Sequence, residues 1–259
     1  MKTHRILALG IASLFLAAPV HAAVFSWDGG GANDNISTAA NWLPDGAPVN
    51  DGTSIIQFAG AVRLTPNFST AFSAAQILFL NSADAFVLGG STITIGSGSF
   101  ANLDTQTQTV GNTITVGPSG TAFSATSGDL VFSGAVALGA NLLNVNGANT
   151  TTLGAGITGT GTITKSNATG ILAITSTATA IGADFNLTAG ITRIAPGGVT
   201  QVFSSTSTIA VSGTGTLNFN ESTTLDGALL TMASGTAVNV AVGKTLTVQG
   251  GGIASFANF

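Results

Sequence analysis

The chain has 259 residues, of which 6% are charged and 44% hydrophobic, with 35 glycines and neither cysteine nor tyrosine. Its two histidines, His4 and His21, fall in an N-terminal segment that we expect to be removed. The remaining composition excludes Ser-His-Asp and Cys-His catalysis, His-ligated zinc and disulfide frameworks. Removal of Lys2 and Arg5 leaves a formal charge of −6 and no basic stripe, so we expect no nucleic-acid partner.

Residues 1–22 have the three parts of a Sec-type signal peptide. Two basic side chains precede an apolar run over 6–18, and Val20 and Ala22 place small residues before a predicted cleavage after Ala22. This run is shorter than the roughly 20 residues that a membrane-spanning helix needs. We therefore expect residues 23–259 to be secreted, or held at a bacterial outer cell surface, with no membrane span after signal removal.

Residues 23–58 form a predicted N-terminal capping region that is rich in Trp, Asp, Asn and Gly. Oxygen ligands of this kind suit Ca²⁺, the one cofactor that we consider. The candidate ligands are Asp28, Asp34, Asp45 and Asp51. Their spacing matches neither common calcium-binding loop pattern, and Asp is also an ordinary turn residue, so both interpretations stay open.

Trp27 and Trp42 bracket the most polar part of this region. Large side chains folded over the first coil of a repeat protein would cover its open core and block end-to-end aggregation. Aromatic rings beside polar groups can also stack on sugar rings. The pair therefore predicts either a cap or a carbohydrate-binding surface.

From residue 59 onward the sequence is a series of short phrases that alternate apolar residues with Thr, Ser or Asn and end on Gly. The phrase TITIG at 92–96 recurs 21 positions later as TITVG at 113–117. Other phrases lie at 161–164, 171–175, 208–211, 237–240 and 245–248. Period-two alternation over such short phrases predicts strands, and the intervals between them are too short for crossover helices.

The repeat predicts an all-β chain in which residues 59–259 form a right-handed parallel β-helix, a β-solenoid. Self-similarity at roughly 20 to 29 residues favours stacked coils over hairpins. Residues 23–259 would make about ten coils, and at about 4.8 Å per coil the rod would be on the order of 50 Å long. A pair of β-sandwich domains is the alternative.

One segment resembles the autotransporter-associated β-strand repeat, with its best match at 130–175. The residues that match the repeat pattern are Gly156, Gly159, Gly161, Lys165 and Gly170. Asn167 and Ala168 replace part of the usual glycine pattern. A second resemblance, at 27–42, is to the opening of large secreted bacterial proteins that carry this repeat.

The resemblance implies a β-helix passenger that is displayed on a bacterial surface or released from it. The chain departs from the family because 250–259 contains neither a membrane barrel nor a sorting tail, and we interpret Phe259 as the end of a truncated or abbreviated passenger. The expected function is structural surface display, with adhesion to extracellular glycans or cell-surface components, and self-association as a further expectation.

Two other functions stay open at this stage. The first is a carbohydrate-binding module built on Trp27 and Trp42. The second is a polysaccharide lyase or hydrolase, for which Lys165, Asp184 and Arg193 could approach one another on successive coils. The alternative for these three is that they are solvated corner residues, in which case the chain is not an enzyme.

Overall fold

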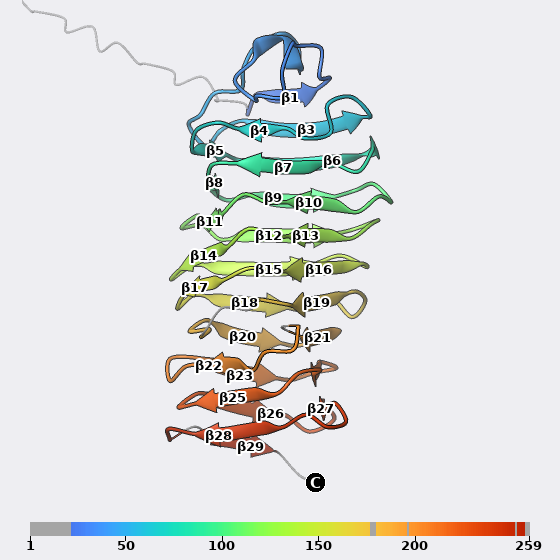
Figure 1. Ribbon diagram of the computed structural model, residues 1–259. Coiled ribbons are helices and arrows are strands. Elements are labelled where there is room, and N and C mark those ends of the chain that lie inside the picture. Colours follow the sequence, from blue (N-terminus) through green and yellow to red (C-terminus); the bar gives the residue numbers. More distant parts are fainter. Residues whose placement is uncertain (1–21, 177–179, 196, 252, 257–259) are drawn as a thin grey trace, which may run out of the picture.

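The computed structural model describes residues 22–176, 180–195 and 197–251, together with the backbone of 253–256. The chain is 49% strand and 1% helix, and it coils into a β-solenoid of about 9 turns. Figure 1 shows these turns stacked from β1 (Val24–Trp27) at one end to β29 (Ile253–Phe256) at the other. The predicted signal peptide, apart from Ala22, and Phe259 lie outside the described residues.

The largest sheet has 12 strands and follows the whole length of the stack. In spatial order they are β2 (Trp42–Leu43), β1, β3 (Ile55–Gly60), β6 (Gln76–Ala83), β9 (Ser99–Asn102), β12 (Thr121–Ala125), β15 (Leu142–Asn146), β18 (Thr162–Lys165), β20 (Asp184–Leu187), β23 (Thr208–Val211), β26 (Leu229–Met232) and β29. Within this sheet β2 runs antiparallel to β1, and the other neighbouring strands run parallel.

Two further faces complete each turn. The second sheet has nine strands: β27 (Ala237–Val240), β24 (Thr216–Phe219), β21 (Ile191–Ile194), β19 (Ile171–Ile174), β16 (Thr150–Leu153), β13 (Leu130–Phe132), β10 (Gln108–Val110), β7 (Val87–Gly90) and β4 (Asn67–Phe68). The third face consists of two sheets. The five-stranded sheet contains, from the N-terminal side, β5 (Phe72–Ala74), β8 (Ile93–Ile95), β11 (Ile114–Val116), β14 (Val136–Gly139) and β17 (Ile157–Gly159). The three-stranded sheet follows with β22 (Gln201–Phe203), β25 (Thr223–Asp226) and β28 (Leu246–Gln249), and an isolated bridge pairs Phe203 of β22 with Ile181 of the preceding turn.

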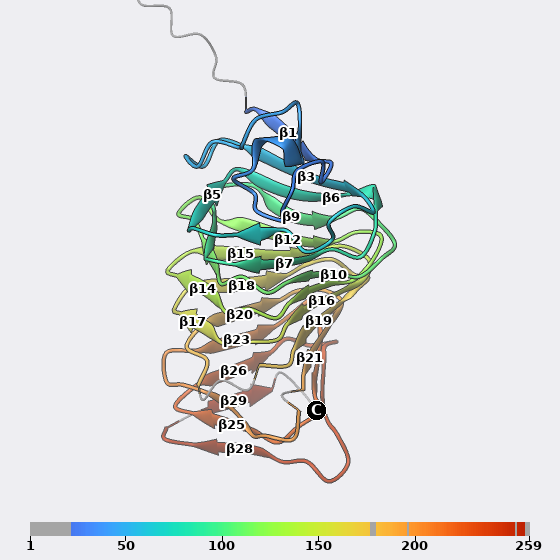
Figure 2. The same ribbon diagram turned by 45° about the horizontal axis from the view of Figure 1, so that its top comes forward.

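The pairing register shows that the turns differ in length. Leu143 pairs with Ile163 of the next turn, whereas Ile191 pairs with Thr216, which is a longer step along the chain. The first turn is the longest, because Val24 pairs with Ile55 and the intervening segment contains β2 and the 3-10 helix η1 (Ala39–Asn41). Figure 2 shows this segment lying over the end of the stack.

The core is a narrow shaft filled by columns of inward-facing side chains. Along the 12-stranded sheet one column is Ile56, Ile77, Phe100, Phe123, Val145, Lys165, Leu187, Val211 and Met232. Facing sheets touch across the shaft, since the rings of Phe123 and Phe132 stack with centroids 3.9 Å apart. Burial of such columns supplies the hydrophobic stabilisation that a chain without cysteine needs.

These observations confirm the predicted all-β solenoid with parallel sheets. The β-sandwich alternative is wrong, because sandwiches are built from antiparallel sheets and the strands here pair with the turns above and below. Among the described residues, no helix combines the length and the apolar character that crossing a membrane would require.

Candidate functional site

Trp27 and Trp42 lie at the N-terminal end of the stack and are both buried. Their rings meet edge to face, with centroids 5.2 Å apart, and each indole N–H donates to a backbone carbonyl. Trp27 lines a depression of about 330 Å³ together with Leu43 and Val62, but only 1% of its surface is exposed. Trp42 is fully buried. Neither ring therefore offers a free face to a sugar, and the carbohydrate-binding use of these two residues is not supported.

The four candidate calcium ligands do not converge. Asp28 accepts a hydrogen bond from the N–H of Gly30, Asp51 accepts two from Thr53, and Asp45 is exposed. Within the described parts of the chain, no group of three or more His, Cys, Asp or Glu side chains could hold a metal ion. Asp28 and Asp51 thus accept hydrogen bonds within their own turns, as turn residues commonly do.

Asp34 has a different role, which is to hold the capping segment to the following turn. Its carboxylate accepts hydrogen bonds from the Thr65 hydroxyl at 2.7 Å and from Arg63 Nη1 at 3.0 Å. These two donors hold the pKa of the Asp34 carboxyl below its ordinary value. Arg63 Nε also donates to the carbonyl of Gly29, although Arg63 has the unfavourable φ of 48°.

The structure separates the three residues that were considered for polysaccharide chemistry. Lys165 and Asp184 lie in the 12-stranded sheet, whereas Arg193 lies in the nine-stranded sheet. Asp184 pairs with Thr162 and faces outward, and Lys165 pairs with Leu187 and faces inward. The two side chains are therefore on opposite sides of one sheet and cannot act on a common substrate.

Lys165 also differs from the solvated corner residue that the sequence suggested. The residue is 1% exposed, and its Nζ donates to the backbone carbonyls of Asn167 at 2.6 Å and Thr169 at 3.1 Å. Burial lowers the pKa of its ammonium group. Its role in the turn between β18 and β19 is structural: the ammonium group satisfies carbonyls that point into the shaft.

The four glycines of the repeat motif lie around the same turn and the turns beside it. Gly156 and Gly159 lie before and at the end of β17, and Gly161 and Gly170 precede β18 and β19. At Gly170, where φ is +73°, an added Cβ would lie 2.5 Å from the carbonyl oxygen of Gly147 in the turn above. The motif thus marks positions where successive turns touch through their backbones.

Nearer the N-terminus, two buried amide side chains hydrogen-bond to turn backbone as Lys165 does. The sequence pattern did not point to either of them. Asn102 Nδ2 donates to the carbonyls of Gln106 at 2.8 Å and Asp129 at 2.9 Å. Gln108 accepts from the N–H of Phe86 and donates to the carbonyl of Asp84. Period-two alternation could have found Asn102, because it shares a face of β9 with Phe100.

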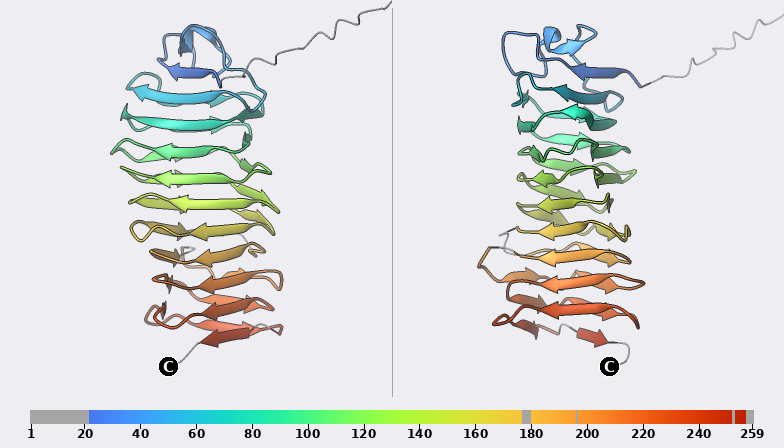
Figure 3. Two further views of the ribbon diagram at one scale, coloured as in Figure 1. Left: turned by 180° about the vertical axis from the view of Figure 1, so that it is seen from behind. Right: turned by 90° about the vertical axis from the view of Figure 1, so that its right-hand side faces the viewer.

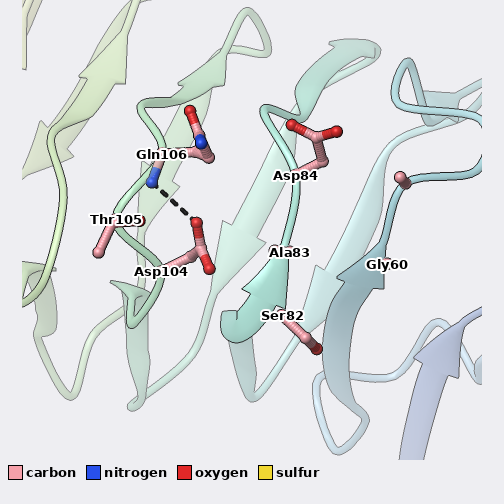
Figure 4. Close-up of a pocket in the computed structure, with 8 residues that line it drawn as sticks. Gly60, Ser82, Ala83, Asp84, Asp104, Thr105 and Gln106 are labelled. Atoms are coloured by element: carbon pink, nitrogen blue, oxygen red, sulfur yellow. Dashed lines mark hydrogen bonds between the residues drawn. The ribbon is translucent and has the colours of Figure 1, made fainter.

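The turns that these amides hold form a shallow depression of about 370 Å³. Figure 4 shows Asp84 and Asp104 on successive turns, with Ser82, Thr105 and Gln106 around them. Each carboxylate accepts a backbone hydrogen bond within its own turn, from Ala85 N–H for Asp84 and from Gln106 N–H for Asp104. The depression is lined by polar groups, with one carboxylate from each of two successive turns.

Comparisons with protein-family models, curated proteins and solved structures give no match for this chain. The resemblance to the autotransporter-associated repeat therefore depends on the motif residues alone. What the geometry adds is the place of those residues, which lie where successive turns stack.

Proposed function

We propose that this chain is an exported, passenger-type β-solenoid whose function is to present an extended surface outside the cell. The signal-like sequence of residues 1–22 and the repeat motif at 130–175 support export and a passenger role. The alternatives of a carbohydrate-binding module and a polysaccharide-active enzyme are not retained, because Trp27 and Trp42 are buried and Lys165, Asp184 and Arg193 are apart.

The observation that carries this proposal is the chemistry of the outward-facing columns. One column of the 12-stranded sheet consists of Gln76, Ser99, Ala122, Asn144, Thr164, Asn186, Ala210 and Thr231. These side chains are small or medium in size and uncharged. Six of the eight are polar, and successive turns place them at the strand spacing of about 4.8 Å, which makes a long, wettable face.

Such a face supports adhesion through many weak contacts. A single polar contact contributes little, but a partner that engages several turns at once gains affinity because each later contact is intramolecular. The rod presents its contacts on successive turns along one face, so a partner can engage several of them without a pocket. Glycans and cell-surface components, which are extended and rich in hydroxyl groups, are the partners that this surface suits.

The proposal is tested by the location and intact mass of the protein made in a bacterial host. We expect a species that begins at Ala23 and lies outside the inner membrane, in the envelope or the medium. A matched variant with Leu9→Arg and Leu14→Arg, which interrupts the apolar run, should stay in the cytoplasm as the uncleaved chain. Recovery of the unaltered chain in the cytoplasm, with Met1 still present, would overturn the proposal.

A further inference from the structure

Two depressions join into one groove along a corner of the rod, close to the capped end. The polar depression has a volume of about 370 Å³, and the apolar one beside Trp27 has a volume of about 330 Å³. Gly60 and Ala61 line both of them and so connect them. This corner groove follows the ends of β3, β6 and β9, on the cyan to green turns of Figures 1 and 3. Its walls come from residues 26–106, all of which the structure describes.

An irregularity in the 12-stranded sheet shapes this corner. The register of β3 and β6 shifts after Phe58, so that residues 80–82 of β6 lie opposite residue 59 of β3 before pairing resumes at Gly60 and Ala83. The last of these extra residues lines the polar depression. Bulges of this kind interrupt the ladder and occur often beside active sites, where they redirect side chains.

The half of the groove beside the cap is apolar. Leu43 of β2 is 65% exposed and Val62 is 53% exposed, and both line the depression that Trp27 also lines. A sugar ring stacks on an exposed aromatic face, which this half does not offer, because Trp27 is buried. The exposed aliphatic groups suit an aliphatic side chain of a partner instead, since contact would remove apolar surface of both from water.

The other half of the groove is acidic. Asp84 and Asp104 line it from successive turns, and Asp28 lines the apolar half. Asp104 is only 7% exposed, and its Oδ1 accepts from the N–H of Gln106, whereas its Oδ2 has no hydrogen-bond partner among the described residues. Figure 4 shows this second oxygen directed away from Gln106. A carboxylate that is so little hydrated gains from a nearby positive charge.

No basic side chain in the described part of the chain supplies this charge. Arg63 and Lys244 are engaged in ion pairs elsewhere. Lys165 is buried in the shaft, and Arg193 lies in the nine-stranded sheet. None of the four lines the groove. The groove is therefore complementary to a partner that brings its own positive charge next to an apolar group.

We propose that the corner groove binds a segment of a partner protein in which an aliphatic side chain and a Lys or Arg are two or three positions apart. The aliphatic group packs on Leu43 and Val62, and the basic group lies between Asp84 and Asp104. The spacing follows from the fold, because the two halves are one to two turns, or about 5–10 Å, apart, which an extended chain covers in two or three residues. The groove is separate from the outward column of the 12-stranded sheet, so this inference depends neither on glycan adhesion nor on export.

The experiment measures the binding of hexapeptides, labelled with an uncharged fluorophore, to the purified protein by fluorescence polarisation. We expect GLTTRG to bind about tenfold more tightly than GLTTQG, which lacks the charge. GSTTRG, which lacks the aliphatic group, should also bind more weakly. The double variant Asp84→Asn and Asp104→Asn keeps an acceptor oxygen for the N–H groups of Ala85 and Gln106, and it should bind GLTTRG and GLTTQG equally.

Further variants test the apolar half and the specificity of the acidic half. The double variant Leu43→Thr and Val62→Thr should bind GLTTRG and GSTTRG equally. Asp45→Asn alters an exposed carboxylate of the cap that lines neither depression, and it should leave all three affinities unchanged. Circular dichroism spectra that match the unaltered protein show that each variant is folded.

Three results would overturn the proposal. The first is that the unaltered protein binds none of the peptides, or binds all three equally. The second is a preference for GLTTRG over GLTTQG that survives replacement of both Asp84 and Asp104. The third is loss of that preference in Asp45→Asn, which would place the binding surface on the cap rather than in the groove.

Discussion

Lys165 lies in a core column whose neighbouring members on the adjacent turns are Val145 and Leu187. A charge in such a place is costly unless hydrogen bonds compensate for the loss of water. The compensation here comes from the carbonyls of Asn167 and Thr169. The lysine and its turn are therefore interdependent, and removal of the ammonium group leaves two carbonyls without a donor.

We expect Lys165→Met to destabilise the protein by about 2–3 kcal/mol, because methionine fills the space but donates no hydrogen bond. Urea denaturation followed by circular dichroism measures the difference. Lys244→Met, which removes a partly exposed lysine from an ion pair, is the matched control and should cost less than about 1 kcal/mol. Equal effects of the two substitutions would contradict the structural role of Lys165.

Burial of Lys165 should also make the stability of the protein depend on pH. Burial lowers the pKa of Lys165 in the folded protein, so the unfolded chain binds more protons in the interval between the folded and unfolded pKa values. The free energy of unfolding should therefore rise with pH through that interval, relative to the Lys165→Met variant. A difference between the two proteins that is constant up to alkaline pH would show that the pKa is not lowered.

Thr151, by contrast, has a buried hydroxyl group with no hydrogen-bond partner among the described residues. It lies inside the shaft between Leu130 and Leu172. We expect Thr151→Val to raise the free energy of unfolding by about 1 kcal/mol, because valine has the same shape without the unsatisfied hydroxyl. Thr152→Val, on the outward face of the same strand, should change it by less than about 0.5 kcal/mol. A destabilised Thr151→Val protein would refute this account.

Among the elements, the strands were the most predictable part of the chain. The phrases at 92–96 and 113–117 became β8 and β11, which pair in register as the repeat predicts. Their alternation also fixes which side chains face inward. The polar members of the core, Asn102 and Lys165, follow the same alternation, but a preference for apolar residues inside led us to place Lys165 in solvent.

The capping segment was predictable in position but not in detail. Trp27 and Trp42 pointed to a cap, whereas the pairing of Asp34 with Arg63 joins residues 29 positions apart in a segment without periodicity. Contacts of this kind depend on the path of an irregular loop, which no local pattern encodes. For the same reason the sequence could not show whether the four aspartates of the segment converge.

We expect Trp42→Ala to destabilise the protein by about 3–5 kcal/mol, since it opens a cavity beside Trp27 and Phe58 and uncovers the end of the shaft. Trp42→Phe keeps a ring but loses the hydrogen bond to Ile36, and should cost about 1–2 kcal/mol. Thermal unfolding, followed by the fluorescence of the remaining tryptophan, shows which of the two variants has the lower melting temperature. An unchanged melting temperature for Trp42→Ala would remove the capping role.

At the scale of the whole molecule, the predicted ten coils compare with about 9 turns. The first turn, from Val24 to Ile55, is the longest because the cap is inserted into it. Repetition explains why the architecture could be predicted at all: each turn meets only its neighbours, so a local pattern determines the whole rod. Function is less predictable, because the proposed display surface would have no defining constellation of residues.

The central claim, that the rod faces the outside of the cell, is tested most directly by thiol labelling. The chain has no cysteine, so Asn186→Cys places a single thiol on the exposed face of β20, and Leu187→Cys places one in the shaft as a control. We predict that a membrane-impermeant maleimide labels Asn186→Cys equally on intact and lysed host cells, and labels Leu187→Cys only after denaturation. Labelling of Asn186→Cys that requires lysis would contradict the claim.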